Sequence, residues 1–358
     1  MLCFVKSTNE EMFADITNFC PLTRITIALL LSVLIAWGIG AVALTSPTVC
    51  VTNQTLGMAV PKAGSYKQER EENWVSFHYG EEGLEASDAL RARQEGEKAL
   101  LFGDSYVEAS MVAPQERMQA RLSESGLPCI GIGISGNSCV EYHHLMGIYN
   151  QLISNVTTNI ILIADISDIL PPKGTTDFLS LKPSYPFRKV EGRLGELSYR
   201  FRLMAFRNVL KKTMTAWHNG LDWRGNHWLK LKADDTLEEP VDTSHYEEYW
   251  KNMLSALKTK APQGRLMVVY APIVPSIRDN AISTKNDDEE LIQRFANVCR
   301  SYDLIGGGIV DVSEKLCDYT SQTKRFPRGF FNTRPGAGHL NSEGHRLVAE
   351  AIREVLAP

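Results

Sequence analysis

The first group that could do chemistry is a serine at the end of a short apolar run. Residues 99–102 (Ala-Leu-Leu-Phe) are long enough for a buried strand, and Gly103, Asp104 and Ser105 follow them. A helical stretch over 115–124 comes next. A serine between a strand and a helix lies beside free backbone N–H groups, which can stabilise an oxyanion when its hydroxyl attacks an ester. The same tripeptide is also ordinary turn chemistry, so alone it does not identify a nucleophile.

A second candidate position is a glycine that follows the next strand. Residues 128–134 form a β-rich run that ends in Ser135-Gly136-Asn137, and residues 140–152 then have a helical pattern. Glycine at a strand end lets a ligand approach the backbone closely, with the N–H free to donate. A plain strand-to-helix turn is the competing interpretation. We therefore treat Gly136 as an oxyanion donor and Asn137 as a possible supporting residue.

A third strand end carries a hydroxyl and two carboxylates. Residues 159–164 are continuously apolar, which is typical of a strand in a parallel sheet covered on both faces. They end in Asp165-Ile166-Ser167-Asp168. Ser167 and Asp168 are therefore candidate site residues, with Asp168 in a supporting role.

A histidine near the C-terminus provides a candidate general base. His339 stands immediately before an amphipathic helix predicted over 340–356. Further strands are predicted over 266–270 and 307–312, with helices over 246–260 and 289–302.

Strands that alternate with helices predict an α/β fold with a doubly wound, mainly parallel sheet of five strands. The site of such a sheet lies at the carboxyl ends of its strands. Ser105, Gly136, Ser167 and His339 all fall at such ends or in the last loop, so the pattern predicts that they meet.

These motifs resemble the SGNH/GDSL hydrolases, which have a flavodoxin-like fold. Gly103-Asp104-Ser105 resembles the first block of that family, 134–137 the second, and 339–345 the last. The resemblance covers about 96–170 and 264–358, and it is nearest to bacterial membrane-anchored members, whose usual substrates are acylated envelope glycans or lipids. It implies a nucleophilic Ser105, a basic His339, oxyanion donors at the N–H groups of Ser105 and Gly136, a supporting Asp104, and no cofactor or metal.

Two blocks depart from the family pattern. The third block normally carries an asparagine that donates to the oxyanion; this chain has Ser167 there, and the resemblance implies that its hydroxyl is the third oxyanion donor. The last block normally carries an aspartate three residues before the histidine, where this chain has Gly336. With no acid there, a backbone carbonyl or a distant carboxylate must orient His339, and we expect slow turnover. Glu343 lies one turn beyond the histidine and is expected to face solvent.

The N-terminal part predicts a membrane anchor. Residues 25–44 are twenty residues without a charge, which matches a hydrocarbon core of ~30 Å. Arg24 precedes them and the first basic residue afterwards is Lys62, so the positive-inside rule places residues 1–24 in the cytoplasm and the remainder outside, in the periplasm of a bacterium. A cleaved signal peptide is the alternative. The charge-rich residues 45–95 are expected to form a stalk before a hydrolase-like domain at 96–358.

Composition narrows the possible partners. The chain is 44% hydrophobic and 22% charged, as folded domains are, and its net charge of −4 gives no reason to expect nucleic acid as a partner. No Cys/His spacing resembles a zinc site, and disulfide pairing among the five cysteines beyond residue 44 is left open.

An insertion over 171–263 interrupts the predicted domain. It contains four tryptophans, with Arg200, Arg202 and Arg207 nearby. The aromatic side chains either line a sugar- or acyl-binding groove or pack a helical cap onto the sheet. The tryptophans are Trp217, Trp223, Trp228 and Trp250.

Two functions remain open. One is a membrane-anchored serine esterase or O-acyltransferase that acts on acylated envelope glycans or lipids through an acyl-Ser105. The other is a weak or inactive relative that serves as a scaffold or glycan-binding protein, which the missing aspartate and asparagine favour.

Overall fold

The computed structural model describes most of the chain with gaps. The described residues are 21–43, 50–54, 56–64, 66–69, 72–73, 75–172, 175–184, 245–278, 281–330, 333 and 336–357.

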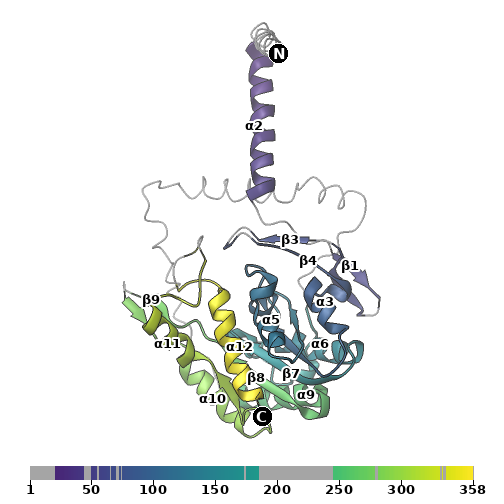
Figure 1. Cartoon of the computed structure of the whole chain (residues 1–358), viewed down its shortest axis with the longest axis vertical. Helices are drawn as coiled ribbons and strands as arrows, with labels where there is room; N and C mark the ends of the chain where they lie inside the picture. Colours follow the sequence, from purple (N-terminus) through teal and green to yellow (C-terminus); the bar gives the residue numbers. More distant parts are fainter. Residues whose placement is uncertain are drawn as a thin grey trace.

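A parallel five-stranded sheet forms the centre of the molecule (Figure 1). Its order is β11 (Ile309–Asp311), β8 (Leu266–Tyr270), β7 (Val156–Ile163), β5 (Lys98–Gly103) and β6 (Cys129–Gly133). The predicted α/β fold with a parallel sheet is therefore confirmed, and each predicted strand overlaps an observed one.

Alternating residues of the central strand enter two separate cores. Leu100 and Phe102 of β5 join one hydrophobic cluster, whereas Ala99 and Leu101 join the other. Successive side chains of a strand point to opposite faces, so a strand buried on both faces must be apolar throughout. This requirement produces the unbroken apolar runs of the sequence.

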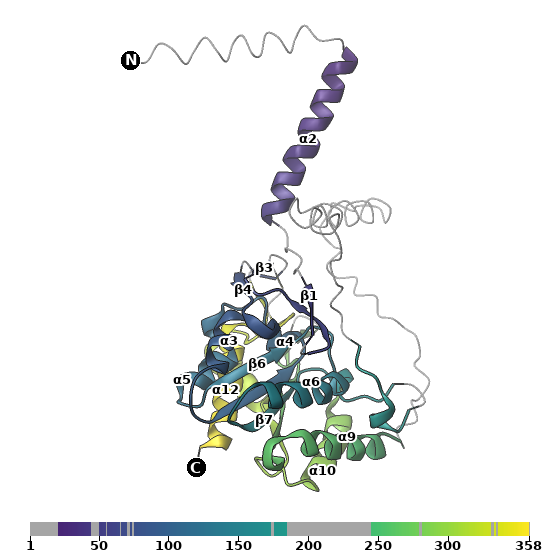
Figure 2. The same ribbon diagram turned by 90° about the vertical axis from the view of Figure 1, so that its right-hand side faces the viewer.

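Helices cover both faces of the sheet (Figure 2). The helices on one face are α6 (Cys139–Leu152), α9 (Tyr246–Lys260) and α10 (Glu289–Arg300). Those on the other are α5 (Met118–Glu124), α11 (Ser313–Thr323) and α12 (Ser342–Leu356). The helix predicted over 246–260 is confirmed as α9, which lies in the crossover from β7 to β8. Its Trp250 is fully buried and donates its Nε1–H to the Ile169 carbonyl at 2.8 Å.

An N-terminal layer packs against this α/β unit where the sequence predicted a stalk. It comprises the antiparallel pairs β1 (Cys50–Asn53) with β2 (Met58–Pro61) and β3 (Tyr66–Glu69) with β4 (Val75–His78), followed by α3 (Ala86–Ala92). Its apolar residues belong to the same core cluster as the sheet: Leu56, Met58, Val60, Leu84 and Ala89. Because these residues pack in the core, the prediction of a stalk is wrong. The sequence suggested a stalk because its few apolar residues are spread among many charged ones.

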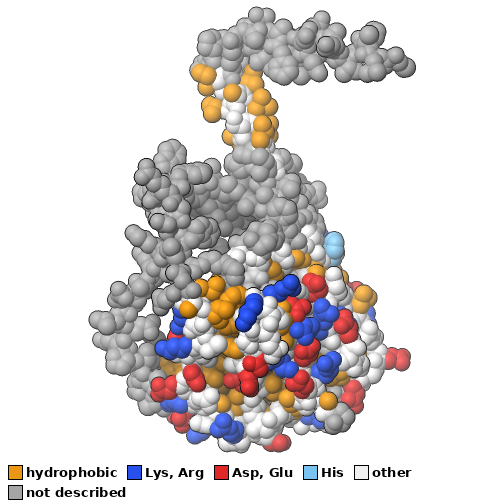
Figure 3. Space-filling model, turned by 60° about the vertical axis from the view of Figure 1, so that its left-hand side comes forward, with side chains coloured by type: hydrophobic (Ala, Val, Ile, Leu, Met, Phe, Trp, Pro, Cys, Tyr) orange, Lys and Arg blue, Asp and Glu red, His pale blue; other side chains and the backbone are white. Residues whose placement is uncertain are grey.

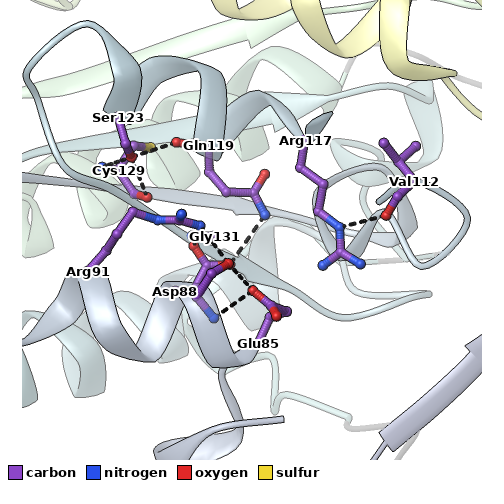
Figure 4. A network of polar contacts seen from close by, with 10 residues as sticks. Glu85, Asp88, Arg91, Val112, Arg117, Gln119, Ser123, Cys129 and Gly131 are labelled. Atoms are coloured by element: carbon purple, nitrogen blue, oxygen red, sulfur yellow. Dashed lines mark hydrogen bonds and ion pairs between the residues drawn. The ribbon is translucent and has the colours of Figure 1, made fainter. Parts of the chain in front are cut away.

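A buried carboxylate fixes this layer to the edge of the sheet (Figure 4). Asp88 of α3 accepts the Gly131 N–H of β6 at 3.1 Å and a hydrogen bond from Gln119 Nε2 at 3.3 Å, and it pairs with Arg91 at 2.6 Å. β6 is an edge strand, whose free N–H groups need partners. The Arg117 guanidinium also lies 4.3 Å from the centre of the Phe77 ring of β4.

Shorter elements complete the described chain. They are the hairpin of β9 (Ser276–Arg278) and β10 (Ala281–Ser283), helix α4 (Ser105–Glu108), and the 3₁₀ turns η1 (Glu81–Gly83), η2 (Pro114–Glu116), η3 (Ile166–Asp168), η4 (Phe178–Ser180) and η7 (Pro262–Gly264). The cysteines at 129, 139, 299 and 317 form no disulfide with one another in the described part of the chain.

A helix, α2 (Pro21–Ala43), covers the segment predicted to be a membrane anchor. Within the described part of the chain, no helix has the length and apolar character needed to cross a membrane. The predicted membrane anchor at residues 25–44 stays a prediction. Three of the four tryptophans of the predicted insertion, and Arg200, Arg202 and Arg207, lie outside the described residues.

Candidate active site

The turn that carries Ser105 is fixed by close packing of β5, α4 and β6. Asp104 caps α4 by accepting the Tyr106 N–H at 2.9 Å. A Cβ on Gly133 of β6 would lie 1.9 Å from the backbone N of Glu108, so only glycine lets α4 sit this close to the sheet. Ser105 is thereby held at the carboxyl end of β5, as the sequence predicted.

His339 lies against Ser105. Its Nε2 is 2.8 Å from Ser105 Oγ, although 234 residues separate the two in the chain. The His339 loop is held by the Gly329 N–H, which donates to the His339 carbonyl at 3.0 Å. Asn341 next caps α12 with its side-chain oxygen and donates its amide to the carbonyls of Phe326 and Gly329 at 2.9 and 3.2 Å.

The other ring nitrogen of His339 contacts Glu72. Glu72 Oε1 lies 2.7 Å from His339 Nδ1, and Glu72 Oε2 accepts the backbone N–H of the same histidine at 3.2 Å. A carboxylate can only accept, so Nδ1 carries the proton and Nε2 is left to accept from the Ser105 hydroxyl. This is the tautomer that a serine nucleophile needs from its base.

Glu72 comes from the short segment between β3 and β4. The next residue, Asn73, anchors it by donating from Nδ2 to the Met111 carbonyl at 2.9 Å. On the other side, Gly338 has φ +81°, and a Cβ there would lie 3.0 Å from Glu72 Oε2. Glycine at this position leaves room for the carboxylate to reach the histidine.

His339 also sets the protonation of Glu72. Burial on its own raises the pKa of Glu72, but the hydrogen bonds and the charge of His339 pull that pKa the other way and leave it below its ordinary value. Glu72 is therefore ionised at neutral pH. Its negative charge would stabilise an imidazolium formed when His339 takes a proton.

The acid that the sequence lacked before His339 thus comes from the N-terminal layer. Gly336 has φ +73°, and a Cβ there would meet the Phe326 ring at 2.8 Å, so the usual position has little room for a carboxylate. Glu343 is not used, as expected, because it pairs with Arg346 at 2.9 Å. Sequence reasoning missed Glu72 because it lies among the charges of the supposed stalk, 267 residues from its partner.

The Gly136 loop is tied to the nucleophile helix. Gly136 has φ +84°, which favours glycine, and a Cβ there would meet no atom within 4 Å. The preceding Ser135 donates its N–H to Glu108 Oε2 at 3.2 Å, and its hydroxyl contacts the same oxygen. Glu108, which the sequence gave no reason to select, therefore connects α4 to the predicted oxyanion loop.

The structure places Ser167 at the end of β7, the neighbour of β5 in the sheet. It is exposed in η3, and its N–H donates to Asp165 Oδ1 at 2.8 Å. No hydrogen bond of its hydroxyl is found within the described ranges. The roles of Ser167 and Gly136 as oxyanion donors stay predictions.

Three residues were predicted to support the site: Asp104, Asn137 and Asp168. Asp104 Oδ2 is 3.3 Å from Ser105 Oγ, and burial raises the Asp104 pKa. Burial, together with the charge of Asp104, also raises the Asp168 pKa well above its ordinary value. The side-chain amide of Asn137 is buried, with no partner among the described residues.

A buried arginine braces the His339 loop. Arg328 donates from Nη1 to the Tyr106 hydroxyl at 2.9 Å and from Nη2 to the carbonyls of Ala271 and Pro272 at 2.7 and 2.5 Å. The Tyr106 ring in turn packs on the His339 ring, with centres 4.9 Å apart. Arg328 lies outside the motifs, so no sequence signal pointed to it.

The sequence and the fold were compared with known proteins. No family model matches the sequence, and no curated protein matches it. Solved structures of a lipolytic G-D-S-L family member, an esterase and an acyltransferase align with the chain at low identity. A member of the lipolytic G-D-S-L family from Veillonella parvula has 12% identity and a TM-score of 0.36, over 73% of this chain and 98% of that one.

Two further structures have the same TM-score of 0.36. A carbohydrate esterase family 2 enzyme with a carbohydrate-binding domain, from Corynascus thermopiles (Myceliophthora fergusii), has 10% identity over 74% of this chain and 68% of its own. The salicylyl-acyltransferase SsfX3 of a tetracycline biosynthetic pathway has 8% identity over 74% and 56%. The first neighbour belongs to the family that the motifs resemble. At this TM-score the functional argument rests on the chain's own residues.

Glu72→Gln tests the role of the carboxylate. The glutamine amide keeps the shape of the side chain but can donate to Nδ1, which favours the tautomer with the proton on Nε2. We expect kcat for a small acetyl ester to fall on the order of 10³–10⁴-fold with a smaller change in KM. Glu343→Gln makes the same exchange on a carboxylate paired only within α12 and should keep activity. An equal, small effect of both variants would exclude Glu72 from catalysis.

Proposed function

We propose that the chain is a serine esterase or O-acyltransferase of the SGNH/GDSL type. The observation that carries the proposal is the continuous relay from Glu72 through His339 to Ser105, with contacts of 2.7 and 2.8 Å. Both distances suit hydrogen bonds along which a proton can move. The nucleophile lies at a strand end beside backbone N–H groups, as acyl transfer requires.

In the first half of the reaction, Ser105 attacks the ester carbonyl. The Ser105 proton passes to His339 Nε2, and the ionised Glu72 stabilises the resulting imidazolium. The N–H groups of Ser105 and Gly136, with the Ser167 hydroxyl, hold the negative oxygen. His339 then returns the proton to the departing alcohol oxygen, leaving an acyl group on Ser105.

In the second half, a hydroxyl group removes the acyl group. His339 takes a proton from water, or from the hydroxyl of an acceptor alcohol, which attacks the acyl-Ser105 carbonyl. Collapse of the tetrahedral intermediate releases the acid or the new ester, and the proton on His339 returns to Ser105. The same residues serve an esterase and a transferase, which differ only in the acceptor.

One reason for the scaffold hypothesis was the absence of an aspartate three residues before His339. Glu72 removes this reason, because the base has an orienting carboxylate after all. Ser167 still stands where the family has an asparagine. This difference affects one oxyanion donor and leaves the contacts among Glu72, His339 and Ser105 in place. The catalytic hypothesis is therefore the better supported of the two. From the resemblance, we propose acylated envelope glycans or lipids as substrates.

We also propose that residues 25–44 anchor the chain in a membrane with the site in the periplasm. The twenty uncharged residues and the basic residue before them support this orientation. Figure 3 shows hydrophobic side chains gathered on α2, whereas charges of both signs are interspersed on the α/β domain. Large apolar side chains exposed on a helix favour a covering by lipid. They are Ile25, Leu29, Leu30, Leu31, Val33, Leu34 and Ile35.

A fusion to Pro358 tests this location. A reporter enzyme that folds only outside the cytoplasm should be active when joined to the full chain, and the same fusion lacking residues 1–44 should be inactive. Equal reporter activity with and without residues 1–44 would contradict the proposal, as would a stable but inactive full-length fusion.

Covalent labelling of the full chain with a fluorophosphonate tests the proposed chemistry. We expect one label per chain, on Ser105, because the relay raises the nucleophilicity of that hydroxyl alone. Ser105→Ala should abolish labelling. Ser321→Ala, on an exposed turn of α11, should label as the unaltered chain does. No labelling, or labelling that persists in Ser105→Ala, would contradict a serine enzyme.

A further inference from the structure

A groove of about 440 Å³ opens beside the catalytic histidine. One wall is the segment Gly336–Gly338, which leads directly into His339. The rest of the lining includes strand β9, residues 285–288 after β10, and Asp165 just after β7. Its volume falls in the range of ~300–1,000 Å³ typical of small-molecule sites.

The position of the groove matches one half of an ester substrate. His339 must return its proton to the alcohol oxygen as the C–O bond breaks, so that oxygen lies next to Nε2. The remainder of the alcohol then extends on the His339 side of Ser105. The groove begins on that side, because the backbone of its wall continues into His339 itself.

The lining combines hydrogen-bond donors and acceptors. Lys285 is exposed, and its ammonium has no hydrogen-bond acceptor among the described residues. Asp288 is the N-cap of α10, yet its side chain accepts no capping hydrogen bond, so its oxygens are available to a ligand. Arg278 and Asp287 pair at 2.6 Å and neutralise each other in the wall.

Two apolar side chains lie between these polar groups. Ile273 is 44% exposed and Ile277 is 37% exposed, and both line the groove. A sugar ring offers hydroxyl groups at its edge and C–H groups on its faces, which suits such a mixed surface. A hydrocarbon chain would instead remove Lys285 and Asp288 from water without replacing their hydrogen bonds, which is costly.

We propose that this groove holds the alcohol half of the ester and that this half is a neutral, polyhydroxylated group such as a sugar. The proposal rests on the proposed function for the direction of the substrate. It selects the glycan rather than the lipid among the two substrate classes, and it names Lys285, Asp288 and Ile277 as residues that determine specificity.

Binding of saccharides to the full chain with Ser105→Ala tests the groove without turnover. The probes are the neutral trisaccharides of glucose and of N-acetylglucosamine, titrated by calorimetry. We expect saturable binding of at least one probe. Ile277→Trp should weaken it tenfold or more, because the indole fills the groove, and Lys285→Ala should weaken it several-fold. Leu90→Trp, at an exposed position on α3 that does not line the groove, should leave it unchanged.

Activity gives a second readout in the chain with Ser105 intact. For 6-O-acetylglucose, Ile277→Trp should lower kcat/KM at least tenfold more than it does for p-nitrophenyl acetate, whose leaving group is small. A fold-loss equal for the two esters would overturn the assignment to the alcohol half.

The outcomes separate this proposal from the proposed function. The proposed role of the groove would be overturned, even if Ser105 is labelled, by either of two results. One is that neither saccharide binds, and the other is that Ile277→Trp and Leu90→Trp change binding equally. Binding that Ile277→Trp abolishes in a chain whose Ser105 is never labelled would support a saccharide groove and overturn the esterase.

Discussion

The hydrogen bonds between Glu72 and His339 are the interaction on which the site depends. They fix both the ring orientation and the tautomer of the histidine, because one carboxylate oxygen takes the ring proton and the other takes the backbone N–H of the same residue. A serine hydroxyl is a weak nucleophile without a base that can accept its proton. The relay therefore requires an N-terminal segment and a C-terminal loop to meet at the end of β5.

The N-terminal layer supplies the carboxylate that contacts His339. Its apolar residues join the core that covers one face of the sheet, and Asp88 satisfies an N–H group of the edge strand β6. A buried carboxylate is stable only when it is paired and hydrogen-bonded, so Asp88 favours one way of docking the layer. Asn73 then links the Glu72 segment to Met111, in the loop after α4. The same layer that packs on the sheet therefore carries the carboxylate that contacts His339.

The sequence predicted the features that depend on the local pattern of apolar and polar residues. Apolar runs such as 159–164 and 266–270 identify buried parallel strands, and strand ends place Ser105 and Gly136 at one edge of the sheet. Glu72 could not be predicted, since neither periodicity nor a motif marks a carboxylate that acts across 267 residues. Arg328 and Glu108 were missed for the same reason: their partners lie on other elements, and only packing brings them together. The stalk was predicted wrongly because short strands with few apolar residues resemble a linker.

The most direct test of the relay is a double-mutant cycle on the rate of fluorophosphonate labelling. The four proteins are the unaltered chain, Glu72→Gln, His339→Ala and the double variant. If Glu72 acts through His339, Glu72→Gln slows labelling by on the order of 10²-fold or more in the unaltered chain, but changes it by less than about threefold once His339 is absent. The same fold-loss in both backgrounds would show that Glu72 acts independently of the histidine, and it would contradict the relay.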